Sequence, residues 1–534
     1  MNDRKTYINA AVYTGESFAD AFTVEDGKFI AVGTLNDLPA ERGEVIDLKG
    51  NFVCAGFNDS HMHLLNLGQT LDMANLAAHT ASLEDMLGCL KAYIEENKPA
   101  VGTWVRGRGF NQDYFSGEHR FPSRYDLDTV SKDHPICITR ACGHICVVNS
   151  KALEILGIDK NTPQPVGGRF NVDEQGEPTG QFFETALDMV YHAMPTPDKK
   201  SIRRMIKKGC KRLNSYGITS CQSDDYESVP GLPYTTVMET FEDMAASGEL
   251  TVRVNEQAHF TNVPALSAFI EADHHKRGTN RFKNGPLKML GDGSLGARTA
   301  YLSRPYADDP ATQGIPIYTQ EQFNEMCALA NRNGMPIAIH SIGDGILDRI
   351  LDAYEKALEE CPRDDHRHGI VHCQITRPDQ LERIKNMNLH VYAQSIFIDY
   401  DSRIVHARVG DELASTSYGA KSFIDNGVTL SNGSDAPVED PVALRGIQCA
   451  VTRRSIGSTD IPYRPEEVLS VSEAIDTFTK GAAYASFEEN IKGKIQPGML
   501  ADFVVLGENP FKVDPETLHK IPVMATYLEG EQVY

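Results

Sequence analysis

Residues of the types that commonly bind metal ions follow several short apolar runs in this sequence. The first is the pair His61 and His63, which follows an apolar segment that ends at Asp59. Side chains alternate along an extended strand, so these two histidines point to the same side. Two imidazoles on one side of an extended segment can bind a single metal ion through ring nitrogens. A His-x-His pair alone is a weak signal, so its meaning depends on what accompanies it.

A lysine in an apolar strand is the second feature. Lys288 lies in the run Leu287-Lys-Met-Leu290. Burying a charged lysine is costly, so it needs a partner or a lowered pKa. A neutral lysine can add carbon dioxide to become a carbamate, a carboxylate mimic that can bridge two metal ions. The alternative, a surface lysine at the end of a strand, stays open at this point.

Three further candidates follow other apolar runs. His340 ends the run 336–340, His372 ends the run 369–372, and Asp435 comes shortly after the run 428–431. One such residue is more often structural than functional. The whole set, which lies in or after the first, fourth, fifth, sixth and eighth of the predicted strands, indicates a single metal site.

The segments that position these residues alternate between short apolar runs and helical stretches, which is typical of βα units. Eight such strands predict a TIM-type (β/α)8 barrel of the α/β class, whose active site lies at the carboxyl ends of the strands. We place the strands at 53–59, 218–223, 251–257, 287–290, 336–340, 369–372, 390–394 and 428–431.

Two regions do not fit the barrel pattern. Residues 1–56 and 481–534 contain short strands, with Asp26-Gly27 as a hairpin turn. They predict a small β-sandwich built from both termini, around a barrel domain at 57–480. The segment at about 66–213 is too long for one βα unit, and we expect a helix-rich cap subdomain inserted after the first strand.

The composition excludes several classes of protein. The net charge of −22 disfavours nucleic-acid binding. No apolar stretch of roughly 18 residues indicates a membrane span, and the charged N-terminus is unlike a signal peptide. The 11 cysteines include no C-x-x-C pair, which favours reduced thiols in a cytoplasmic protein.

Several motifs resemble the amidohydrolase superfamily, specifically the YtcJ-like branch (amidohydrolase family 3) that includes N-substituted formamide deformylases. The resemblance covers nearly the whole chain, and the segment that begins at Lys288 is the most specific to this branch. The motifs are Gly56-Phe-Asn-Asp-Ser-His-Met-His63, Lys288-Met-Leu-Gly-Asp-Gly-Ser-Leu-Gly-Ala-Arg-Thr-Ala300, His340-Ser-Ile-Gly-Asp344, Val371-His-Cys-Gln374, Gly433-Ser-Asp-Ala-Pro-Val438 and Gly493-Lys-Ile-Gln-Pro-Gly-Met-Leu-Ala-Asp-Phe-Val-Val505.

The resemblance implies a role for each ligand candidate. His61, His63 and Asp435 would hold one metal ion, and His340 and His372 a second. Carbamylated Lys288 would bridge the two ions. One or two zinc ions are expected, because imidazole and carboxylate suit zinc. The metal would lower the pKa of water from about 15.7 towards 7, and Asp435 would act as the general base in hydrolysis of a C–N bond of a small-molecule amide or N-formyl amide.

Other residues are second-shell or substrate candidates. Asp292 and Asp344 could orient a ligand histidine or, equally, cap a helix. Arg298 could hold a substrate carboxylate or a structural one. His144 and Glu184 lie in motifs that resemble the branch, and Trp104 is either a core residue or part of an apolar substrate wall. Family resemblance also leaves a homodimer open.

Two other functions remain open from the sequence. One is a deaminase or a cyclic-amide or ureide hydrolase on the same barrel, against which Lys288 argues if it is carbamylated. The other is a catalytically idle relative that serves as a binding protein. The complete ligand set argues against that second reading.

Overall fold

A computed structural model describes residues 4–116, 119–140, 145–165, 168–184, 186–229 and 231–534. The chain divides into two compact units, Met1–Asn66 with Gly209–Tyr534, and Leu67–Lys208. The boundaries fall within helices α1 (Leu64–Leu71) and α6 (Lys199–Ser215). Among the described residues, no helix is both long and apolar enough to cross a membrane.

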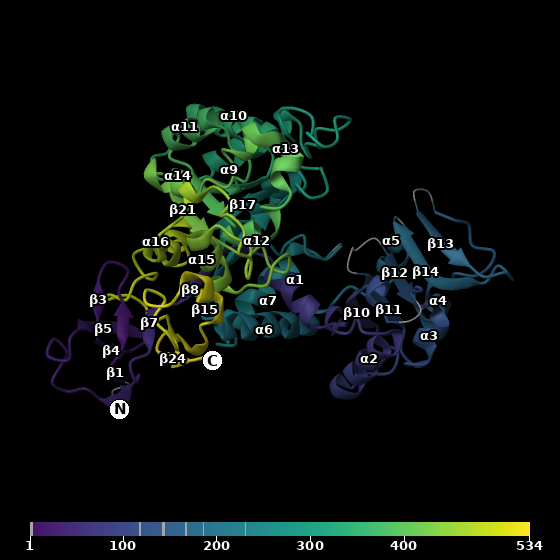
Figure 1. Ribbon diagram of the computed structural model, residues 1–534, viewed down its shortest axis with the longest axis horizontal. Helices are drawn as coiled ribbons and strands as arrows, with labels where there is room; N and C mark the ends of the chain where they lie inside the picture. Colours follow the sequence, from purple (N-terminus) through teal and green to yellow (C-terminus); the bar gives the residue numbers. More distant parts are fainter. Residues whose placement is uncertain (1–3, 117–118, 141–144, 166–167, 185, 230) are drawn as a thin grey trace. The chain divides into compact units, whose positions relative to one another are not determined.

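Eight parallel strands form the centre of the first unit, in sheet order β21-β20-β19-β18-β17-β16-β15-β8 (Figure 1). The outer strands β8 and β21 meet just beyond their carboxyl ends, where Asp435 N donates to His61 O and His63 N donates to Ala436 O, each at 2.8 Å. The sheet is thus a nearly closed barrel, and the TIM-type prediction is confirmed at this level. The strands are β8 (Phe57–Met62), β15 (Ile218–Ser223), β16 (Arg253–His259), β17 (Phe282–Leu290), β18 (Ile337–Ser341), β19 (Gly369–His372), β20 (His390–Ala393) and β21 (Thr429–Asn432).

Helices follow most of these strands and begin at local capping signals. Asn262 accepts from Ala265 N at the start of α8, and Thr319 forms a capping box with Gln322 at the start of α9. These caps fix where each strand-to-helix loop ends, and therefore how long each loop is. The principal helices are α7 (Tyr234–Ala246), α8 (Val263–Glu271), α9 (Gln320–Arg332), α10 (Asp344–Glu360), α11 (Pro378–Asn386), α13 (Val405–Ala414), α14 (Ala420–Asp425), α15 (Ala443–Thr452), α16 (Val471–Thr477) and α17 (Lys480–Ala485).

The strand predicted at 53–59 is wrong as a single element. The structure splits it into β7 (Phe52–Ala55), which pairs with β22 of a different sheet, and β8, which pairs with β15 of the barrel. The break falls at Gly56, where a Cβ atom would lie 2.3 Å from Oγ1 of Thr219. A glycine is needed there because the two backbones approach closely as the chain passes from one sheet to the other.

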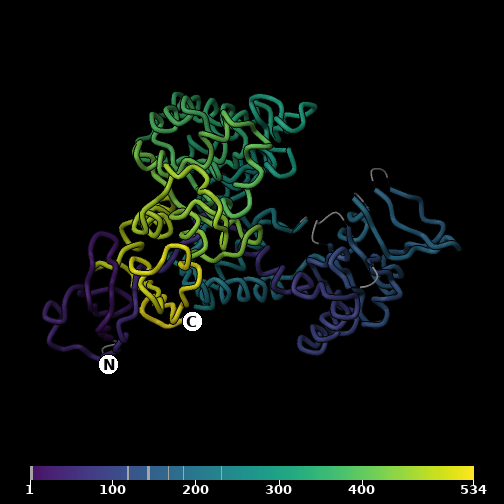
Figure 2. The backbone as a smooth tube through the Cα atoms, viewed as in Figure 1, coloured from purple at the N-terminus to yellow at the C-terminus, as the bar shows by residue number. Residues whose placement is uncertain are grey.

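Strands from both ends of the chain lie side by side (Figure 2). Their buried faces share one hydrophobic cluster that includes Tyr7, Phe22, Phe503 and Tyr527. The Asp26-Gly27 hairpin is confirmed, since both residues have positive φ between β4 and β5. The two sheets are β5-β4-β1-β6 and β24-β23-β22-β7-β2-β3, with strands β1 (Lys5–Ile8), β2 (Ala11–Tyr13), β3 (Phe18–Ala19), β4 (Ala21–Glu25), β5 (Lys28–Gly33), β6 (Glu44–Asp47), β22 (Phe503–Leu506), β23 (Val523–Leu528) and β24 (Glu531–Gln532).

The second unit is centred on a six-stranded sheet, in the order β13-β14-β12-β11-β10-β9, whereas the sequence analysis expected a helix-rich segment. Apolar residues such as Ile136, Ile138 and Val147 pack one face of this sheet against Met86 and Leu90 of α2. Its elements are β9 (Ala74–Asn75), α2 (Leu83–Asn97), β10 (Val105–Phe110), α3 (Arg124–Asp128), β11 (Ile136–Arg140), β12 (Ile145–Val148), α4 (Ser150–Leu156), β13 (Gly168–Val172), β14 (Pro178–Glu184) and α5 (Leu187–Tyr191).

Candidate metal centre

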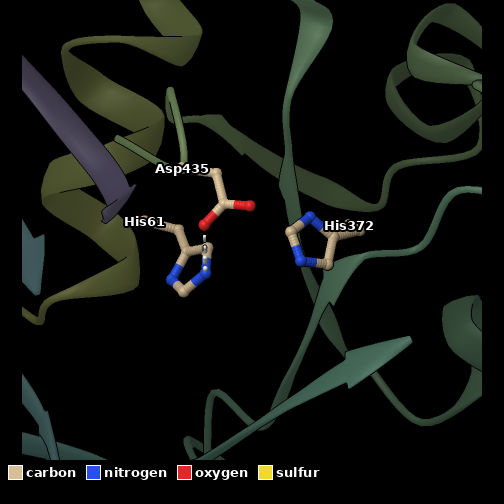
Figure 3. Close-up of side chains that lie close together, drawn as sticks. All are labelled: His61, His372 and Asp435. Atoms are coloured by element: carbon tan, nitrogen blue, oxygen red, sulfur yellow. Dashed lines mark ion pairs between the residues drawn. The ribbon is translucent and has the colours of Figure 1, made fainter. Parts of the chain in front are cut away.

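The six predicted ligands lie together at the carboxyl end of the barrel. Side-chain nitrogens or oxygens of His61, His372 and Asp435 all lie within 4.8 Å of one another (Figure 3). Nε2 of His63 is 3.1 Å from Oδ1 of Asp435, and Nε2 of His61 is 3.4 Å from the same oxygen. The ring of His340 is 4.5 Å from that of His372, centroid to centroid.

In all four histidines, Nδ1 faces a protein oxygen and Nε2 is directed to the candidate metal site. Each Nδ1 faces an oxygen acceptor, so it carries the proton and leaves Nε2 to bind a metal ion. This shared arrangement fits a metal centre, because ligand histidines characteristically have the second nitrogen tied to a protein oxygen. The pairs are His61 with Gln257 Oε1 at 2.8 Å, His63 with Asp224 O at 2.9 Å, His340 with Asp292 Oδ1 at 3.0 Å and His372 with Gln394 Oε1 at 2.6 Å.

Lys288 is fully buried and its ammonium is paired. Its Nζ lies 3.2 Å from Oδ2 of Asp224, and Oδ1 of the same carboxylate lies 3.2 Å from Nδ1 of His259. The surface alternative for Lys288 is thereby wrong. Lys288 is therefore a buried residue paired with Asp224, and its role as a bridging group stays a prediction.

Sequence reasoning missed Asp224, His259, Gln257 and Gln394. Asp224 directly follows β15 and His259 ends β16, so the rule used for the other strands would have found both. The two glutamines carried no signal, since neither is a common metal ligand and their role appears only once the strands are side by side.

Burial lowers the pKa of two of the histidines, whereas ion pairing raises the pKa of a third. Burial, with Lys288 nearby, lowers the pKa of His61 to about 4, and burial beside His340 holds the pKa of His372 well below its usual range. Burial acts against His63 as well, but hydrogen bonding to Asp435 and the charge of Asp224 raise the pKa of His63 to about 9. At neutral pH, two of the ligands are therefore neutral, and His63 is protonated against Asp435.

Left-handed backbone conformations cluster beside the ligands. His372, Cys373 and Asp435 have φ of 71°, 46° and 59°. Such conformations are unfavourable for residues other than glycine and concentrate at functional sites. The close approach of Gly433, where a Cβ atom would lie 2.5 Å from the backbone nitrogen of His61, belongs to the same packing of the chain around the site.

Comparison with known proteins identifies the family of this chain. A sequence profile of the amidohydrolase family matches residues 44–534. This chain belongs to the amidohydrolase family. It is 33% identical over 522 residues to YtcJ of Bacillus subtilis (strain 168), which carries an amidohydrolase name, with 96% of each chain covered. It is 25% identical over 547 residues to N-substituted formamide deformylase of Arthrobacter pascens, with coverage of 98% and 97%.

A solved structure gives the same result for the fold. The crystal structure of an uncharacterized metal-dependent hydrolase from Pyrococcus horikoshii OT3 superposes with a TM-score of 0.78 at 28% identity, covering 96% of this chain and 99% of that one. This amidohydrolase is therefore a hydrolase, and its relatives indicate that it uses a metal ion.

Asp292 holds His340, one of the predicted ligands, in place. Its two oxygens accept from the backbone nitrogens of Tyr301, Ile342 and Gly343, and Oδ1 also accepts from Nδ1 of His340. The carboxylate thus ties the loop after β17 to the loop after β18 and fixes the ring of His340.

Replacing Asp292 by asparagine is expected to weaken metal binding roughly 10–100-fold. The amide would turn a donor toward backbone N–H groups that now donate, so the ring of His340 loses its fixed orientation. Zinc affinity, measured by competition with a chromophoric chelator, checks this. Asp308→Asn is the matched control, since Asp308 pairs with Arg298 in the same long loop after β17. Equal affinity of D292N and D308N would remove Asp292 from the metal centre.

The raised pKa of His63 predicts that metal binding releases a proton. The protonated pair with Asp435 stabilises the metal-free fold fully below the unfolded pKa of about 6.5, and that stabilisation is lost as pH rises through about 9. A metal ion at Nε2 of His63 must displace this proton, so zinc affinity should rise about tenfold per pH unit below pH 9. Calorimetry in CO2-free buffers of different ionisation enthalpy measures the proton count. Zinc affinity that is constant from about pH 6.5 to 8.5 would contradict the assignment.

The remaining candidates of the sequence analysis lie elsewhere. Arg298 forms a two-pronged ion pair with Asp308. Asp344 begins α10 and binds Arg377 and the backbone nitrogen of Ser303. Among the described residues it has no hydrogen bond to a candidate ligand histidine. Trp104 and Glu184 belong to the second unit: Trp104 is half-buried against its core, and Glu184 is exposed at the end of β14. His144 lies outside the described residues.

Proposed function

We propose that this protein hydrolyses a C–N bond in an amide or N-formyl amide of a small molecule, with one or two zinc ions bound at the carboxyl end of the barrel. The observation that carries the proposal is the set of four histidines whose Nδ1 atoms are all tied to protein oxygens beside a carboxylate and a buried lysine. The N-substituted formamide deformylase relative supports this reaction class.

The donor set fits the proposed metal. Imidazole nitrogens and one carboxylate are ligands that zinc prefers, and the second nitrogen of each histidine is already satisfied. His61, His63 and Asp435 would hold one ion, His340 and His372 another, with Lys288 as a carbamate between them. Bound zinc would polarise the carbonyl and make water more acidic.

Asp435 moves the proton in this scheme. Water adds to the carbonyl carbon, the C–N bond breaks, and one water proton must pass to the leaving nitrogen. Oδ1 of Asp435 faces the two histidines, and in Figure 3 the other oxygen points toward His372. That second oxygen takes the proton from water and returns it to the nitrogen. Oriented general acid–base catalysis of this kind contributes roughly 10²–10⁴-fold.

Substrate recognition remains a prediction. His144, Trp104, Glu184 and Arg298 are proposed to contact the substrate, on the basis of the sequence alone. Arg298 can do so only by releasing Asp308, which now occupies its guanidinium.

A panel of N-formyl and N-acyl amines tests the function. We expect release of formate or another acid together with a free amine, lost after chelation and restored by zinc. Ammonia release from heterocyclic amines, with no acid product from the panel, would instead identify a deaminase. A folded protein that binds no zinc and cleaves nothing would indicate a catalytically idle relative.

A further inference from the structure

A second hollow lies at the end of the barrel opposite to the metal centre. Its volume is about 270 Å3, close to the lower limit for small-molecule sites, which is roughly 300 Å3. Asn284 and Pro286 at the amino-terminal half of β17, and Pro336 just before β18, line it. The same two strands carry Lys288 and His340 toward their other ends, so the hollow and the metal centre are separate places on shared strands.

Basic side chains line this hollow, although the protein as a whole is strongly acidic. Lys283, Arg363 and His275 all contribute to its wall, and none of the described residues that line it is acidic. A cationic wall on a chain of net charge −22 is unlike the surrounding surface.

The two permanent charges in the wall are incompletely balanced. Nζ of Lys283 lies 3.5 Å from Glu488, but Lys492 holds that carboxylate more closely, at 2.8 Å. Two lysines thus share one carboxylate. Within the described part of the chain, the bonds of Arg363 go to neutral oxygens, namely those of Asn331, Gly334 and Met335. Buried or partly buried cations without a full counter-charge favour an anion nearby.

Two buried polar atoms in the wall also have no hydrogen-bond partner among the described residues. They are Oδ1 of Asn255 and Nδ1 of His275. Asn255 is only 4% exposed, and its Nδ2 donates to Gln222, which fixes Oδ1 as an acceptor. A buried acceptor without a partner is costly, so a donor from a bound molecule would relieve it.

We propose that this hollow binds a small organic anion, a carboxylate or a phosphate, that also carries an O–H or N–H donor. The anionic group would lie near Lys283 and Arg363, and the donor would satisfy Asn255. The half-exposed ring of Phe487 and the side chain of Met335 offer an apolar wall for the body of the ligand. Ligand binding would stabilise the barrel, because the site exists only in the folded chain.

His275→Glu tests the proposal with little structural risk. Nδ1 of His275 has no hydrogen-bond partner among the described residues, so the substitution breaks no bond of that atom, and it places a negative charge in the wall. The matched control is Lys276→Glu in the same short turn, whose side chain is 67% exposed and pairs with Asp273. The control changes the net charge by more than the test variant does, so a general charge effect would weaken it more.

The measurement is calorimetric titration of the full-length protein, with and without zinc, at low ionic strength. The probes are malate and glycerol 3-phosphate. Two control compounds each lack one feature: inorganic phosphate lacks the organic part with its hydroxyl donor, and glycerol lacks the negative charge. We expect malate or glycerol 3-phosphate to bind one site with zinc absent, H275E to lose at least about tenfold in affinity, and K276E to match the wild type. Binding of one probe alone distinguishes a carboxylate site from a phosphate site.

Three outcomes would overturn the proposal. They are absence of binding by both hydroxylated anions, equal loss of affinity in H275E and K276E, and binding that requires zinc. None of them bears on hydrolysis at the metal centre, so the two proposals fail separately.

Discussion

An Asp435→Asn variant is expected to keep its fold and to lose roughly 10²–10⁴-fold in kcat, the range of a general acid–base residue. Asparagine has the same shape and tolerates the left-handed backbone at this position, where φ is 59°. The hydrogen bond from its backbone nitrogen to His61 O can persist. The amide, however, can neither accept the proton of water nor deliver it to the leaving nitrogen.

Turnover of the substrate identified from the panel, together with zinc content and circular dichroism, checks this expectation. Asp440→Asn provides the control, because Asp440 is exposed in the same loop after β21. Near wild-type turnover in D435N would exclude Asp435 as the proton carrier. If excess zinc fully restores the turnover of D435N, the role of Asp435 is metal binding alone.

A Lys288→Arg variant separates the two roles open to this lysine. Arginine keeps the positive charge that faces Asp224 but forms no carbamate, because its guanidinium does not lose a proton in proteins. If a carbamate bridges two ions, K288R binds one zinc ion fewer and its turnover falls roughly 10²–10³-fold, the range for removal of one group that stabilises the transition state. If the lysine serves only as the partner of Asp224, turnover stays close to that of the wild type.

Lys288→Met provides the second measurement. Methionine fills the buried space without a charge, so it breaks the pair with Asp224 and abolishes the carbamate together. K288M and K288R should be equally inactive under the bridging account. Activity in K288R with none in K288M would show that the charge, rather than the carbamate, is what the site needs. Circular dichroism of both variants establishes that each is folded.

Strands such as β18, β19 and β20 could be predicted because each is a short apolar run with a polar residue at or just after its carboxyl end, whereas β15 and β16 also bury several polar side chains. The metal-centre candidates followed from the same rule, since a barrel brings the carboxyl ends of all strands to one face. His61, Lys288 and His372 could therefore be predicted as metal-site candidates from the sequence alone. The signal is strong because chain order and spatial order coincide around a parallel barrel.

The remaining features depend on partners that the local sequence does not specify. The sequence near Gly56 does not show that the chain passes from one sheet to another there. This change of sheet depends on the close approach of Thr219, which is distant in the sequence. The role of Gln394 arises only from its contact with His372. Likewise, the sequence around Arg298 does not show that its guanidinium pairs with Asp308.

The proposed two-metal centre depends most on Lys288, and anomalous diffraction from crystals grown with zinc and bicarbonate tests it directly. Data collected on both sides of the zinc absorption edge give the number of ions and their positions. We expect two zinc peaks at the carboxyl end of the barrel, one beside His61 and one beside His340, with density for a carboxylate continuing from Nζ of Lys288 between them. A single peak, with an unmodified Lys288 still paired to Asp224, would contradict it.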